Sequence, residues 1–123
     1  MRYSPALPGK EDFVFDILGR KFTLDTGTML LVGRDERENE IISTFSHYGN
    51  VFLKIDDVPG PLCMLRGNIT NEALDLAAGI CLRYSKAKGA GGKRAVYGLD
   101  PTRMERSIPA PVFTEEYCAS FQD

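Results

Sequence analysis

Two groups of side chains in this 123-residue chain could bind an anionic ligand that has a flat part. The first lies on residues 50–56, where the alternation of a β-strand places Asn50, Phe52 and Lys54 on one face and the aliphatic residues on the other. An aromatic ring between an amide and an amine suits such a ligand. The alternative is an ordinary cross-strand aromatic that stabilises the sheet while its polar neighbours are solvated.

The second group is a basic run within twelve positions, which has glycines between its members and no acidic residue. Its members are Arg83, Lys86, Lys88, Lys93 and Arg94. Such side chains hold phosphates. The glycines differ from a phosphate-binding P-loop, because Ala87 stands where that loop requires its first glycine and Arg94 where it requires Ser or Thr. We interpret residues 89–94 as a flexible basic linker.

Arg34 and Asn39 lie near the start of a predicted helix, where backbone N–H groups and the helix dipole attract anions. Asp35 is the expected N-cap of this helix, with Glu38 three residues later. Spacing alone leaves open the alternative that Arg34 is an ordinary surface charge.

Strands and two helices must position these residues. Apolar alternation and turn residues predict strands over 13–18, 20–24, 28–32, 51–55, 62–65 and 95–98, with a short strand at 112–113. The two prolines and the glycine of residues 56–61 predict a stiff turn. A longer helix is predicted over about 71–87, capped by Thr70. We expect an α+β domain, a mainly antiparallel sheet with two helices packed on it.

The remaining segments are predicted to be irregular. Residues 1–11 carry two prolines and read as an N-terminal arm, so that the domain itself spans 12–123. Residues 99–111 contain three prolines and are expected to form a loop over the sheet, and residues 117–123 a docking tail.

Composition excludes several classes of protein. No segment approaches the ~20 apolar residues of a membrane span, and the N-terminus lacks the apolar core of a signal peptide, so we expect a cytoplasmic protein. Cys63 and Cys81 are expected to be small buried hydrophobes, and with a single histidine we expect neither a metal site nor a cofactor. A net charge of −2 argues against indiscriminate coating of nucleic acid and allows a local basic patch.

Three motifs of this chain match one family pattern in the same order. The first is Gly33, Arg34, Asp35, Asn39 and Ile42; the second is Asn50, Val51, Phe52, Lys54, Pro59, Gly60 and Leu62; the third is Ala73, Ala77, Ala78, Tyr84 and Ser85, followed by Val96-Tyr97. Over residues 20 to 112 the chain therefore resembles the NFACT-R domain, the RNA-binding module of NFACT proteins that work on obstructed large ribosomal subunits. This domain is also found alone as a small protein.

The second motif departs from the family pattern at three positions. The family has histidines where this chain has Lys54 and Leu62, and an acidic residue where it has Asn50. Lys54 keeps a hydrogen-bond donor and adds a fixed charge suited to a phosphate, whereas Leu62 keeps neither. Either this chain binds differently from its relatives or it has lost part of their activity.

The resemblance implies an RNA-binding module that is not an enzyme, acts on tRNA or ribosomal RNA, and is linked to translation or ribosome-associated quality control. Arg34 and the basic run would hold phosphates and Phe52 would stack on a base. Asn39, Asn50 and Lys54 would add polar contacts. We also expect a protein partner that supplies the rest of an NFACT-like assembly.

Two other functions are weighed against RNA binding. One is a protein–protein interaction module whose Pro-Gly loop and exposed aromatic face dock a partner without direct RNA contact. The other is an enzyme on a small ligand. Catalysis is the least favoured, because no residue pair has the spacing of a nucleophile with its base and the adjacent Asp56 and Asp57 lie in a turn.

Overall fold

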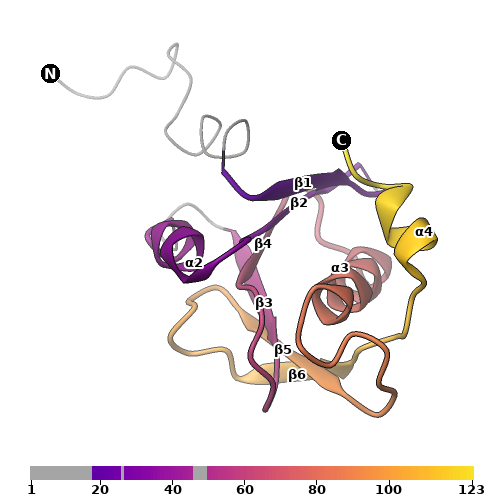
Figure 1. Ribbon diagram of the computed structural model, residues 1–123. Coiled ribbons are helices and arrows are strands. Elements are labelled where there is room, and N and C mark those ends of the chain that lie inside the picture. Colours follow the sequence, from indigo (N-terminus) through magenta and orange to yellow (C-terminus); the bar gives the residue numbers. More distant parts are fainter. Residues whose placement is uncertain (1–17, 26, 46–49) are drawn as a thin grey trace, which may run out of the picture.

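The protein folds around one six-stranded antiparallel sheet (Figure 1). The structure, a computed structural model, describes residues 18–25, 27–45 and 50–123. The spatial order of the strands is β1-β2-β4-β3-β5-β6. Their bounds are β1 Arg20–Thr23, β2 Met29–Val32, β3 Val51–Ile55, β4 Cys63–Arg66, β5 Arg94–Gly98 and β6 Arg106–Pro109. With the helices α2 (Glu36–Ser43), α3 (Asn71–Arg83) and α4 (Glu115–Ala119), this confirms the predicted α+β class.

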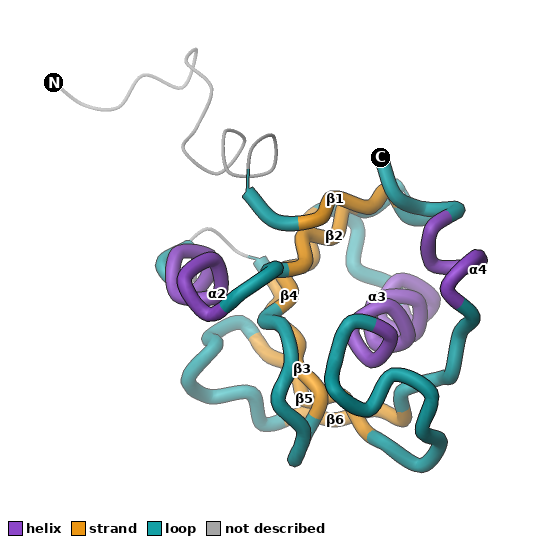
Figure 2. Tube along the Cα trace, in the orientation of Figure 1, coloured by secondary structure: helices purple, strands orange, loops and turns teal. Residues whose placement is uncertain are grey.

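Helices cover both faces of the sheet. α3 lies against one face and α2 against the other, with the strands between them (Figures 1 and 2). The alternation predicted for β3 is confirmed, because Val51, Leu53 and Ile55 belong to the larger core under α3. Phe52 points the other way and packs in the smaller core under α2. A residue on the second face of this sheet is therefore not automatically exposed.

The predicted helix starts are confirmed by their caps. The Asp35 carboxylate accepts a hydrogen bond from the Glu38 N–H at 2.9 Å, and the Thr70 hydroxyl accepts one from the Ala73 N–H at 3.0 Å. α3 ends at Arg83, four residues before the predicted end. The Ser85 hydroxyl donates to the Leu82 carbonyl at 2.7 Å and accepts from the Ala87 N–H at 3.1 Å, and these bonds turn the chain out of the helix.

The prediction of a loop throughout 99–111 is wrong, since β6 pairs with β5 within it. β6 is a short edge strand that ends in Pro109, with three of its four residues exposed, so its sequence lacks the apolar alternation by which strands are recognised. The predicted strand at 112–113 does not form. Phe113 instead packs against α3, where a side chain at Gly79 would overlap its ring.

The C-terminal tail docks as expected, on the edge strand β1. The Thr23 N–H donates to the Phe121 carbonyl and the Asp123 N–H to the Lys21 carbonyl, each at 2.9 Å. The predicted arm at 1–11, and all but the last residue of the predicted strand at 13–18, lie outside the described residues.

The three cysteines are buried free thiols, as expected for Cys63 and Cys81. Within the part of the chain that the structure describes, no three His, Cys, Asp or Glu side chains are grouped as a metal site would require. No helix among these residues has the length and apolarity to cross a bilayer.

Candidate nucleic-acid interface

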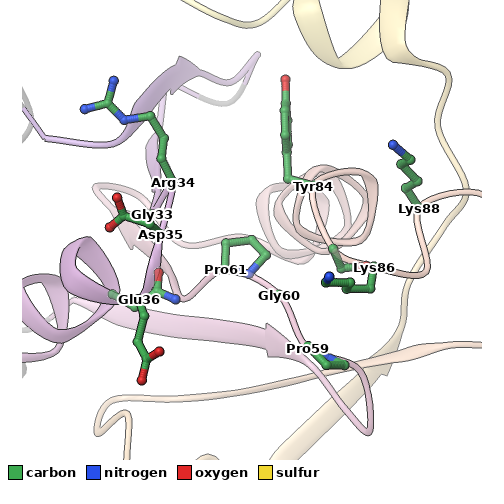
Figure 3. Close-up of a pocket in the computed structure, with 12 residues that line it drawn as sticks. Gly33, Arg34, Asp35, Glu36, Pro59, Gly60, Pro61, Tyr84, Lys86 and Lys88 are labelled. Atoms are coloured by element: carbon green, nitrogen blue, oxygen red, sulfur yellow. The ribbon is translucent and has the colours of Figure 1, made fainter.

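An open pocket of about 680 Å³ lies where three distant segments meet. Its walls are the start of α2 with the preceding residues 33–35, the turn Pro59-Gly60-Pro61, and residues 84–88 at the end of α3. Figure 3 shows Arg34 and Asp35 on one side, Tyr84 and Lys88 on the other with Lys86 below them, and the turn at the bottom of the view. The pocket therefore joins the first motif, the Pro-Gly turn and the beginning of the basic run.

The first motif holds the α2 wall in place. The Gly33 N–H donates to the Leu62 carbonyl at 3.1 Å, and the Leu62 N–H donates to the side-chain oxygen of Asn39 at 3.0 Å. A Cβ at position 33 would overlap that oxygen, which explains the glycine. Asn39 lines the pocket as predicted, but its side-chain oxygen accepts the hydrogen bond from the Leu62 N–H and so links the helix to the backbone of Leu62.

Arg34 is held in one orientation by Glu38. Its backbone N–H, Nε and Nη2 donate to the Glu38 carboxylate at 2.8, 3.1 and 2.7 Å, respectively. The Arg34 hydrogen bond lowers the pKa of Glu38 to about 2, against an opposing effect of burial, and the same bond raises the pKa of Arg34. Because the Arg34 side chain is 49% exposed and its bonds to Glu38 use only Nε and Nη2, Nη1 is available for a phosphate.

The Pro-Gly turn packs directly on the end of α3. The Lys86 N–H donates to the Pro59 carbonyl at 3.0 Å. A Cβ at Gly60 would lie 2.8 Å from the Ser85 Cβ, closer than real Cβ atoms approach. The glycine thus allows the turn to lie against Ser85, and this contact places Lys86 at the pocket.

The aromatic residue of the pocket is Tyr84, which caps the C-terminus of α3. Its half-buried ring packs against Phe22 with a centroid separation of 5.8 Å, and the Arg20 guanidinium carbon lies 4.8 Å from the ring centroid. Burial raises the pKa of Tyr84, although Arg20 opposes the shift. The hydroxyl therefore stays protonated at neutral pH.

The sequence did not indicate this role for Tyr84, because the residue also fits the apolar face of the helix. Arg20 was missed as well, since nothing in its own segment links it to α3. The available signal was a tyrosine at the C-terminal end of a helix immediately before the basic run.

Four predicted contact residues line this pocket: Arg34, Asn39, Lys86 and Lys88. Lys54 is exposed in a neighbouring pocket of about 300 Å³, which also contains Leu62. The two positions at which the family pattern has histidines are thus together in this second pocket. Neither of these two positions lines the larger pocket.

The expectation that Phe52 offers an exposed stacking face is wrong. The ring is 0% exposed, because α2 covers this face of the sheet and Ile42 and Phe45 pack in the same cluster. The predicted contact from Asn50 is wrong for the same reason. Asn50 is 2% exposed and its side-chain amide donates to the Phe45 carbonyl at 3.2 Å.

The basic run is divided by its glycines. Arg83 turns toward the C-terminal helix, where its guanidinium lies 3.7 Å from the Glu115 carboxylate. Lys93 and Arg94 are outside the pocket lining, because residues 89–92 carry the chain on to β5. There the Arg94 Nε donates to the Ser107 hydroxyl at 3.2 Å. Only Lys86 and Lys88 of the predicted run reach the pocket.

Comparison with solved structures shows a similar fold in the C-terminal part of the fibronectin/fibrinogen-binding protein from Streptococcus suis. The TM-score is 0.72 at 17% sequence identity, and the match covers 99% of this chain and 53% of that chain. Among curated proteins, none matches this chain. The family described as the NFACT protein RNA binding domain matches residues 19–121, which include all three motifs and the whole pocket. This chain therefore belongs to the family of NFACT protein RNA binding domains.

Proposed function

We propose that this protein binds RNA in the pocket between α2 and the end of α3, and that Arg34, Lys86 and Lys88 hold the phosphates. The observation that carries the proposal is that three cations from two separate segments line one pocket with an aromatic ring, in a chain of an RNA-binding family. The RNA is proposed to be tRNA or ribosomal RNA, bound without catalysis in the cytoplasm during translation or ribosome-associated quality control.

The charges of the pocket support selective binding of moderate strength. Arg34 is oriented before any ligand arrives, so little side-chain entropy is lost when it binds a phosphate. Asp35 and Glu36 line the same pocket and repel a polyanion, and Asp35 also caps α2. With three phosphate contacts on a single strand, the plot of log affinity against log salt should have a slope of about −2.

We also propose a protein partner that contributes the rest of an NFACT-like assembly. The Streptococcus suis chain is about twice as long as the part that this domain matches. The alternative of a protein interaction module without RNA contact required the Pro-Gly loop together with an exposed aromatic face on β3, and that ring is buried.

Two double variants test the RNA site with equal changes in charge. K86Q/K88Q removes two cations that line the pocket, whereas K93Q/R94Q removes two from beyond the glycines. Fluorescence anisotropy with labelled tRNA should show about a tenfold loss of affinity for the first variant and a much smaller loss for the second. Equal losses would mean that the pocket is not the site. Crosslinking and sequencing of RNA bound in cells would identify the RNA.

A further inference from the structure

Resting on the RNA-binding function proposed above, the geometry points to Tyr84 as the platform on which one unpaired base stacks. The pocket then binds a single-stranded segment or an end of the RNA rather than a continuous duplex, and Arg34 contacts an adjoining phosphate. Tyr84 takes the role that the sequence suggested for Phe52.

The ring of Tyr84 is anchored before binding. The residue is the C-cap of α3, and its N–H donates to the Ile80 carbonyl at 3.2 Å. Its ring packs at 5.8 Å on the fully buried Phe22, and the Arg20 guanidinium lies over the ring, 4.8 Å from its centroid, so a base must stack on the face that Arg20 leaves open. In Figure 3 the ring stands upright from the end of the helix, seen edge-on between Arg34 and Lys88. A partly buried ring that is already packed against Phe22 and Arg20 loses little entropy when it stacks on a ligand.

The surroundings of the ring favour a nucleobase over a cationic side chain of a protein. An aromatic face attracts both flat bases and cations. Here Arg20 already lies over the ring, and the pocket lining has three cations, Arg34, Lys86 and Lys88, against two acids, Asp35 and Glu36. A further cation would be repelled by this excess of positive charge. A base is flat and uncharged, and it brings a phosphate that these same cations attract.

The position of the ring favours an unpaired base. In a duplex, the faces of each base are covered by its neighbours, and the phosphates lie on the outside. Tyr84 stands in a pocket that is also walled by the turn at Pro59, Gly60 and Pro61, instead of on a projecting surface that could enter a groove. A base can reach the ring only if it leaves the helical stack, as it does in loops, bulges and ends.

The test compares two RNAs of equal length, a single strand that contains 2-aminopurine and a blunt hairpin. Wild-type protein should quench 2-aminopurine fluorescence in the single strand and bind it about tenfold more tightly than the hairpin. Tyr84→Leu should abolish the quenching and weaken single-strand binding about tenfold, whereas Tyr84→Phe should keep both. Tyr117→Leu is the matched control, an exposed tyrosine of α4 outside the pocket.

The outcomes separate this inference from the proposed function. If K86Q/K88Q loses binding but Tyr84→Leu binds the single strand as the wild type does, the pocket binds RNA and the stacking role is wrong. If neither variant changes binding, both are wrong. If wild-type protein prefers the hairpin or leaves 2-aminopurine unquenched, the stacking role is wrong even where Tyr84→Leu fails to fold.

Discussion

Phe52 in β3 and Tyr84 at the end of α3 are two aromatic residues that lie near basic side chains in the sequence, but they differ in their exposure to solvent. Phe52 is fully buried between the sheet and α2, whereas Tyr84 is half-exposed and lines a pocket with Arg34, Lys86 and Lys88. The difference lies in what covers each residue. The middle of this sheet is enclosed on both sides by helices, and the end of a helix remains open to a ligand.

The largest expected effect comes from truncating the two rings. Phe52→Ala should lower the free energy of unfolding by about 3–5 kcal/mol, because it leaves a cavity in the core under α2. Tyr84→Ala should cost less than about 2 kcal/mol, since its ring is only half-buried. Urea denaturation measures both. Equal losses of stability would contradict the contrast between the two positions.

The next effect contrasts a glycine of the Pro-Gly turn with a glycine inside the basic run. Gly60→Ala should destabilise the protein by about 1–3 kcal/mol, because its Cβ would meet Ser85 where the turn packs on α3. Gly91→Ala should be neutral or stabilising by up to about 1 kcal/mol, since a Cβ at this position would have no other atom within 4 Å. Thermal unfolding followed by circular dichroism tests the pair. A tolerated Gly60→Ala would show that the turn does not need this close contact.

Acid should weaken the α2 wall of the pocket through Glu38. The pKa of Glu38 is about 2 in the folded protein and 4.5 ordinarily, so its contribution to stability is complete above about pH 4.5 and is lost as the pH falls toward 2. Glu38→Gln should lower stability at pH 7 by about 1–2 kcal/mol and flatten this part of the pH profile.

The matched control for Glu38 is Glu36→Gln, an exposed position on the same helix. Urea denaturation between pH 2.5 and 7 distinguishes the two variants. A Glu38→Gln protein that keeps the wild-type acid dependence would assign that dependence to other carboxylates.

The smallest effect is expected at Lys54, in the neighbouring pocket with Leu62. Lys54→Gln should change stability by less than about 0.5 kcal/mol and leave the salt dependence of RNA affinity unchanged. Lys86→Gln should reduce the slope of log affinity against log salt by about 0.7, the value of one lost phosphate contact on a single strand. A similar reduction for Lys54→Gln would extend the RNA site across the Pro-Gly turn.

Local patterns predicted much of the fold. The β3 alternation, the caps at Asp35 and Thr70 and the α+β class are confirmed, since each depends on residues that are close in sequence. The edge strand β6 was missed because it is short, exposed and ends in a proline. Its identity as a strand comes from pairing with β5, which its own residues do not reveal.

For the site, the amino-acid sequence was enough to establish the order of the three motifs and the family resemblance, and to predict four of the residues that line the pocket. Which aromatic is accessible and which cations share a pocket depended on tertiary packing. Phe52 is buried because α2 packs over it. Tyr84 and Arg34 line the same pocket because the Gly33 N–H donates to the Leu62 carbonyl and the Lys86 N–H donates to the Pro59 carbonyl. Exposure and proximity depend on what packs against a residue from distant parts of the chain, whereas caps and alternation depend on neighbours in sequence.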